Sequence, residues 1–194
     1  FATIPDVDVA HSLVTVLLSS VGPLAAPDAF WAATTVVHRT ATHSLLVGGV
    51  LAVGAVAVAT GIGRRRSRHL SLVGGLVLSG LLWSVYAVSG PVTAAVVGVE
   101  VLAGVGLAIL GVRYDVDSRW LLVAALFGLL SHPFGDLFTG QPPPFLYPLG
   151  VDVVTSRVSL SADPTLHVVG AFLLELATVW LALAVVARLY DRRL

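Results

Sequence analysis

The sequence predicts an all-α fold, a polytopic membrane helix bundle of about five transmembrane helices with an interfacial N-terminal segment. Of its 194 residues, 57% are hydrophobic and only 11% are charged, and the mean hydropathy is +0.95. Soluble domains average about 45–50% apolar and about 25% charged residues. The apolar residues also gather into runs of about 20, which is the length that a helix needs to cross a bilayer.

Composition limits the function as well. The formal net charge is zero, which excludes a broad basic surface, so we expect the lipid bilayer as a partner and no nucleic acid. Cysteine is absent, so neither a disulfide framework nor a thiolate metal site is possible. We expect a single integral membrane domain over residues 1–194. Because methionine is also absent and residues 1–4 are mostly apolar, a further helix is expected upstream.

The N-terminal segment, residues 6–37, is expected to lie at the membrane interface or to enter the membrane and return. Gly-Pro and Pro-Asp pairs break its apolar residues into short pieces. The first full span is expected at residues 41–60, followed by a tight loop with four arginines. The second and third spans are expected at residues 70–89 and 91–112, because proline is favoured at the first helical position after the turn at Gly90.

The fourth span begins at Trp120 and contains a proline. Only about a dozen residues lead up to Ser131, or about 18 Å at 1.5 Å per residue, whereas a hydrocarbon core is about 30 Å thick. We therefore expect this helix to continue, kinked at Pro133, to about Thr139.

The last span follows a loop rich in proline and polar residues. Asp163 is expected to cap it and Pro164 to open its first turn, with the helix ending near Ala187. If the spans alternate, most arginines fall on one side, namely residues 64, 65, 66, 68, 113, 119, 188, 192 and 193. The positive-inside rule makes that side cytoplasmic, so the polar residues of the other loops are expected toward the outer face of the cell membrane.

Three short polar stretches on this outer side carry residues that bind metal ions: PDVD, HRTATHS and LSHPFGD. Imidazole and carboxylate ligands suit Zn²⁺, Mn²⁺ or Fe²⁺, and the number of candidates is sufficient for one or two ions. We therefore predict a site for a divalent metal ion, zinc or manganese above all, whose candidate ligands are Asp6, Asp8, His38, His43, His132 and Asp136.

Each stretch alone also has a plain structural explanation. The i, i+4 spacing of His132 and Asp136 places both on one helix face, where a hydrogen bond between them would stabilise the kink. HRTATHS would be a polar helix start that anchors at the interface. Asp6 and Asp8 point the same way only in an extended or turn conformation, and a lone pair of this kind is usually a solvated turn. His11 and His167 are weaker candidates, and the common location of the set favours a site.

Two residues are expected to take part in catalysis as well. His43 is expected in the first turn of a helix, where free N–H groups favour an anion, and Arg39 adds a bidentate donor to phosphate. Asp136 would orient His132 or bind the metal, and a metal-bound water would attack phosphorus. A site recessed in the outer leaflet favours an amphiphilic, phosphate-containing substrate.

Two other functions stay open. Glu100 and Glu175 lie near mid-membrane in different spans, where they would share a proton as a structural pair or serve an ion carrier or transporter. A transporter predicts internal repeats and broken helices at the midplane, and no convincing repeat is visible. A metal that only staples the bundle is the second alternative, and it would leave no open coordination position.

The three stretches, together with the FLYPL that follows them, resemble a family of membrane-bound metal-dependent hydrolases, also described as LexA-binding and inner-membrane-associated. The family pattern is PDxD, then HRxxTHS, then SHxxxDxxT and a later Pro-Leu, and the resemblance covers residues 1–149. It implies hydrolase activity and a metal site at the six candidate ligands. In the family an upstream helix usually carries another histidine, which is expected before Phe1, and here Pro133 and Gly135 interrupt the third motif.

Overall fold

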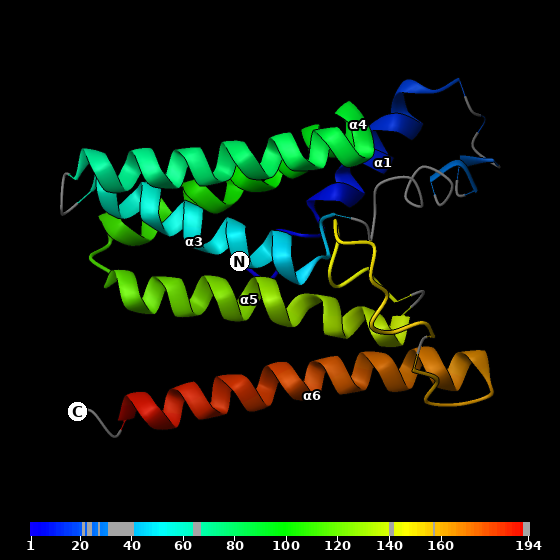
Figure 1. The fold of residues 1–194 in the computed structure, drawn as a ribbon. Helices are drawn as coiled ribbons and strands as arrows, with labels where there is room; N and C mark the ends of the chain where they lie inside the picture. The colour runs from blue at the N-terminus through cyan, green and yellow to red at the C-terminus, as the bar shows by residue number, and fades with distance from the viewer. Residues whose placement is uncertain are drawn as a thin grey trace. The chain divides into compact units, whose positions relative to one another are not determined.

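In the part of the chain that the computed structural model describes, the regular elements are all helices and no strand occurs, which confirms the predicted all-α class. The described residues are 1–20, 22, 25–26, 28–30, 41–63, 67–139, 142–156 and 158–191. The helices are α1 (Val7–Leu18), α3 (Leu45–Ile62), α4 (Arg68–Arg113), α5 (Ser118–Thr139) and α6 (Pro164–Asp191) (Figure 1).

Three described helices, α3, α4 and α5, are long and apolar enough to cross a membrane. The 46 residues of α4 do not form one straight helix, because Gly90 has non-helical angles (φ 81°, ψ −176°). Its positive φ suits glycine, and α4 folds back on itself at this point (Figure 1). We call residues 68–89 the first arm and residues 91–113 the second arm. They correspond to the predicted second and third spans.

The chain forms two compact units. The first consists of Phe1–Pro133 and Pro143–Val154, and the second of Phe134–Pro142 and Thr155–Leu194. Below they are named the first unit and the second unit. The expectation of one integral membrane domain stays a prediction.

The core of the first unit lies around α3, which packs closely against the first arm of α4. A Cβ atom added to Gly74 would lie 2.8 Å from the carbonyl oxygen of Gly54 and 2.8 Å from the backbone nitrogen of Val58. Small residues of this kind let two backbones approach in a membrane, where helices associate by packing rather than by exclusion of water. The side chains that point outward are large and apolar instead: Leu76 is 72% exposed and Leu102 is 73% exposed. This pattern fits a surface solvated by lipid.

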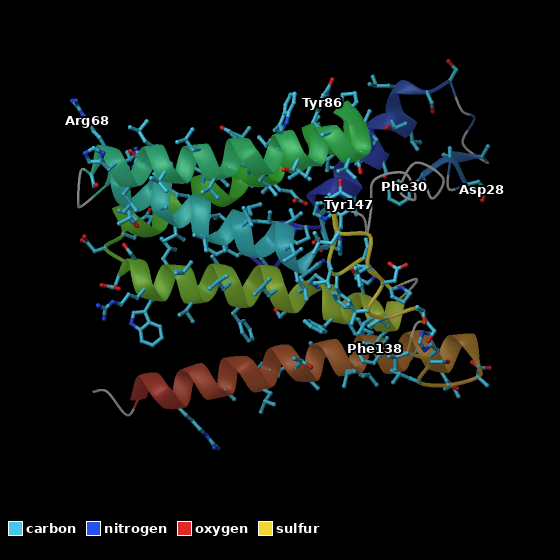
Figure 2. The ribbon with its side chains drawn as sticks, viewed as in Figure 1. Asp28, Phe30, Arg68, Tyr86, Phe138 and Tyr147 are labelled. Atoms are coloured by element: carbon cyan, nitrogen blue, oxygen red, sulfur yellow. The ribbon has the colours of Figure 1, made fainter. Side chains whose placement is uncertain are left out.

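The first unit has two ends that are marked by different residues. At one end the Thr60 hydroxyl donates a hydrogen bond to Ser118 Oγ at 3.0 Å, which ties the end of α3 to the start of α5. The exposed Arg68 lies at this end, and Tyr147 lies at the opposite end (Figure 2). We call them the arginine end and the loop end.

In the second unit, α6 begins at Pro164, as predicted. The Asp163 carboxylate accepts a hydrogen bond from the backbone N–H of Leu166 at 2.9 Å, which confirms Asp163 as the cap. The preceding helix, α5, continues past Pro133 to Thr139, as the length argument predicts. That α6 crosses the membrane stays a prediction.

The N-terminal segment contains a helix that the sequence analysis did not anticipate. α1 has 12 residues and contains neither glycine nor proline. Asp6 precedes it in a helical conformation (φ −73°, ψ −2°), and its carbonyl oxygen accepts a hydrogen bond from the Val9 N–H at 3.0 Å. Asp8 lies within the first turn of α1, so its backbone is not extended.

Candidate metal centre

Three of the six candidate ligands meet at the loop end of the first unit. Asp6, His43 and His132 each offer one ligand atom, and these atoms all lie within 4.8 Å of one another. His43 Nε2 is 3.2 Å from His132 Nε2, and His132 Nε2 is 3.3 Å from Asp6 Oδ1. The three residues come from the starts of α1 and α3 and from the body of α5, and we call them the Asp–His–His cluster.

Burial decreases across the cluster. His43 is fully buried, with 0% of its surface exposed, whereas the side chain of His132 is 17% exposed and that of Asp6 is 50% exposed. The His43 ring is therefore enclosed by its surroundings, and Asp6 is the most exposed member of the cluster.

The start of α3 positions His43. Ser44 is the N-cap, and its hydroxyl oxygen accepts hydrogen bonds from the N–H groups of Leu46 at 3.2 Å and Val47 at 3.4 Å. His43 therefore precedes the helix, and the expectation that it lies in the first turn is wrong, because the serine after it takes the cap position. His43 Nδ1 is 2.8 Å from Thr42 Oγ1, which leaves Nε2 to face His132.

A loop from much later in the chain holds the same helix start. The Ser44 hydroxyl donates to the Tyr147 carbonyl oxygen at 2.8 Å, and the Leu45 N–H donates to the Phe145 carbonyl oxygen at 2.9 Å. The Tyr147 hydroxyl is in turn hydrogen-bonded to Ser89 Oγ at 2.7 Å, at the end of the first arm. These contacts tie the segment that contains His43 to the loop at residues 145–147, and that loop in turn to the first arm of α4.

Close backbone packing positions His132. A Cβ atom on Gly48 of α3 would lie 3.3 Å from Leu129 Cβ, and a Cβ atom on Gly128 would lie 2.8 Å from the backbone nitrogen of Ala2. α5 is therefore pressed against α3 on one side and against the N-terminal segment on another. His132 follows Gly128 by about one turn of the helix, so this packing brings its ring toward His43 and Asp6.

Two of the three separations in the cluster can be compared with those of a tetrahedral metal site. With metal–ligand bonds of about 2.0–2.1 Å, adjacent ligand atoms of a tetrahedron are about 3.3–3.4 Å apart. The two separations, 3.2 Å and 3.3 Å, agree with this value and are also the distances of direct polar contacts between neighbouring side chains. Two imidazoles and one carboxylate are also a ligand set of catalytic zinc, which keeps a fourth position for water or substrate.

The other candidates are placed as follows. His38 and Arg39 lie outside the described residues, and so does the side chain of Asp8. Asp136 is half-buried in α5, in the part that belongs to the second unit. Their roles as ligands or catalytic groups stay predictions.

No role in the cluster is assigned to His167, Glu100 or Glu175. His167 Nδ1, in the second unit, accepts a hydrogen bond from the Leu160 N–H at 3.1 Å. Glu100 is 1% exposed in the second arm of α4, and the side chain of Glu175 is outside the described part, so their pairing stays a prediction.

Sequence reasoning missed the supporting role of Thr42 and Ser44. A serine directly before an apolar run is a helix-cap signal, and it was available at Ser44.

The chain was compared with protein families, curated proteins and solved structures. The model of a protein family described as YdjM inner membrane protein matches residues 1–193. Neither the curated proteins nor the solved structures contain a match to the chain. The family description names a membrane location and no reaction.

Proposed function

Since the chain belongs to the YdjM inner membrane protein family, we propose that it acts in the membrane as a metal-dependent hydrolase. The observation that carries the proposal is the Asp–His–His cluster, in which a carboxylate oxygen and two imidazole nitrogens converge at one end of a unit of membrane-type helices. Convergent imidazole and carboxylate ligands of this kind are the ligand set of many catalytic metal sites.

The residues of the cluster have distinct tasks in this proposal. A bound zinc or manganese ion would supply hydroxide near neutral pH by lowering the pKa of its water. His43 would bind the ion through Nε2, and its Nδ1, which is hydrogen-bonded to Thr42 Oγ1, would then carry the proton and hold the ring in place. Asp6 would be the most exposed of the three ligands, on the side from which water or substrate would approach.

The remaining candidates complete the proposal. Asp136 would orient His132 or bind the metal, and Arg39 would bind phosphate oxygens. Asp8 and His38 are the proposed ligands of a second ion.

The proposed substrate is an amphiphilic phosphate ester. Arg68 begins the first arm of α4 and Arg113 ends the second arm, so both lie at the arginine end, away from the cluster. By the positive-inside rule the arginine end would be cytoplasmic, and the cluster would face the outer side of the membrane. A head group at that surface reaches the cluster while its hydrocarbon part stays in the bilayer.

Metal removal tests the proposal. We expect the purified protein to contain one or two divalent ions per chain by elemental mass spectrometry and to hydrolyse a phospholipid or polyprenyl phosphate. A chelator should abolish hydrolysis, and either zinc or manganese should restore it. A protein that takes up no metal would overturn the proposal. Tightly bound metal without hydrolysis of any phosphate ester would instead support the stapled scaffold.

The contact between Thr42 and His43 gives a second prediction. Thr42→Val keeps the shape of the side chain but removes the hydroxyl that is hydrogen-bonded to His43 Nδ1, so metal affinity should fall about 10–100-fold. Competition with a chelating dye measures the change. Thr93→Val is the matched control, because Thr93 is a buried threonine on α4 and should leave the affinity unaltered. Equal affinity in both variants would contradict the role of Thr42.

A further inference from the structure

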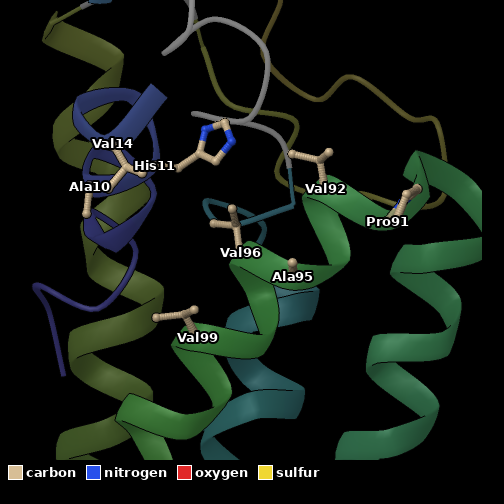
Figure 3. A pocket seen from close by; sticks show the side chains of 8 residues that line it. All are labelled: Ala10, His11, Val14, Pro91, Val92, Ala95, Val96 and Val99. Atoms are coloured by element: carbon tan, nitrogen blue, oxygen red, sulfur yellow. The ribbon is translucent and has the colours of Figure 1, made fainter. Parts of the chain in front are cut away.

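A cavity of about 530 Å³ lies in the first unit between α1 and the second arm of α4 (Figure 3). Its lining consists of Ala10, His11, Val14, Pro91, Val92, Ala95, Val96 and Val99. His11 is the one side chain in this set that carries a polar group. The cavity has the volume of an ordinary ligand site, which is about 300–1,000 Å³.

We propose that this cavity binds an acyl chain of a membrane glycerolipid and forms the tail subsite for the substrate of the Asp–His–His cluster. The lipid site is argued from the cavity alone. The substrate role rests in addition on the proposed hydrolase function.

The surroundings of the cavity favour a hydrocarbon chain. The second arm is part of a helix that is long and apolar enough to cross a membrane, and Val92 and Val99 are each 48% exposed. A buried water needs two to four polar partners, and this lining supplies one. An open apolar cavity on a lipid-facing helix is therefore filled by lipid rather than by water.

His11 favours a lipid with a polar backbone over a plain hydrocarbon. Its side chain extends from α1 toward α4 (Figure 3). Its Nδ1 is buried and makes no hydrogen bond to any residue that the structure describes. A buried polar atom without a partner is costly inside a membrane, and a glycerol hydroxyl can both donate and accept a hydrogen bond. The glycerol backbone of a lipid therefore suits His11.

The position of the cavity relates it to the cluster. Asp6 stands at the N-cap of α1, and Ala10 follows it by four residues, which is a rise of about 6 Å, while Val14 lies about 12 Å along the helix. On the other wall, Pro91 is at the loop end and Val99 is about 12 Å further along the second arm. α1 and the second arm run in opposite directions along the cavity, so Ala10 is the lining residue of α1 nearest to Asp6, about one turn away, while the wall on the second arm runs from the loop end at Pro91 to Val99 (Figure 3).

Photolabelling of the full chain tests the lipid site. The probe is a phosphatidylcholine with a diazirine on one acyl chain, mixed into phosphatidylethanolamine and phosphatidylglycerol vesicles, with labelled residues mapped by mass spectrometry. We expect labelling of residues 10–14 and 91–99 to exceed, several-fold, the labelling of Leu72 and Leu76. These two leucines are 63% and 72% exposed and do not line the cavity. Equal labelling of both sets would overturn the proposal.

A matched pair of variants sharpens the test. Ala95→Phe fills the cavity, whereas Ala87→Phe adds the same ring at an exposed position on the first arm. Ala95→Phe should reduce labelling of the cavity several-fold, and Ala87→Phe should leave it unchanged. The chain has no cysteine, so Ala95→Cys also reports a second copy at this face by disulfide-linked dimers. Such dimers, or no effect of Ala95→Phe on labelling, would overturn the lipid site.

The substrate role has its own measurement. Ala95→Phe should raise the KM for a long-chain phosphate ester. It should leave unaltered the KM for a short-chain ester with the same head group, and its metal content should equal that of the wild type. Equal KM changes for both esters would overturn the tail subsite while leaving the hydrolase proposal intact. Cavity labelling in a protein that binds no metal would overturn the hydrolase and keep the lipid site.

Discussion

Replacing His43 or His132 by alanine is expected to remove nearly all bound metal. Each change deletes one of the three ligand atoms of the cluster and leaves two, too few for the tetrahedral set. Loss of a hydrogen-bond partner of a ligand costs about 10–100-fold in affinity, and the loss of the ligand itself should exceed this. Elemental mass spectrometry of the purified variants, side by side with the wild type, measures the metal per chain.

A control variant and the difference in burial between the two histidines make this experiment decisive. His69→Ala is the control, because His69 is exposed on the first arm at the arginine end and should retain wild-type metal. His43 is fully buried, so its variant can lose stability, whereas the His132 side chain is 17% exposed and its variant tests the cluster in a folded protein. Wild-type metal in both cluster variants would show that the histidines form a hydrogen bond without a metal role.

Replacing Gly74 by alanine is expected to destabilise the packing of α3 on α4. The new Cβ would lie 2.8 Å from backbone atoms of Gly54 and Val58, which move only if the helices separate. Overpacking of this kind costs about 1–3 kcal/mol, which is roughly 2–12 °C in Tm for a chain of this size. Thermal unfolding in detergent measures the effect.

The neighbouring glycine provides the control for this prediction. A Cβ atom on Gly75 meets nothing within 4 Å in the described structure, and both glycines lie inside the first arm. Both substitutions gain the same helix propensity, so the difference in Tm between them isolates the steric cost. Equal Tm values would show that the two helices do not pack as closely as the structure has them.

The membrane helices were largely predictable because their signals are local. Runs of apolar residues of bilayer length indicated α3, both arms of α4 and the whole of α5, and Gly90 with Pro91 indicated the turn between the arms. The length argument correctly carried α5 past Pro133 to Thr139. The start of α3 was misplaced by four residues, because apolar content alone does not show that the hydroxyl of Ser44 caps the helix.

The arrangement of the site was harder to predict because it depends on contacts across the chain. Spacing within one helix suggested Asp136 as the carboxylate beside His132, whereas the structure brings Asp6 to 3.3 Å from His132 Nε2. That approach depends on Gly128, against which Ala2 packs, and no local pattern reveals such a contact. Thr42 was overlooked for the same reason, since its importance follows from the direction of the His43 ring.

The loop that binds the start of α3 has a consequence for biosynthesis. His43 and His132 are separated by 89 positions in the chain, and Ser44 and Tyr147 by 103. A nascent chain that has inserted α3 and α4 but not α5 therefore holds two of the three ligands and has nothing to brace the segment that carries His43. The chain must be synthesised at least to Tyr147 before these contacts can form, so in the proposed function metal uptake would follow membrane insertion of α5 and would not guide it.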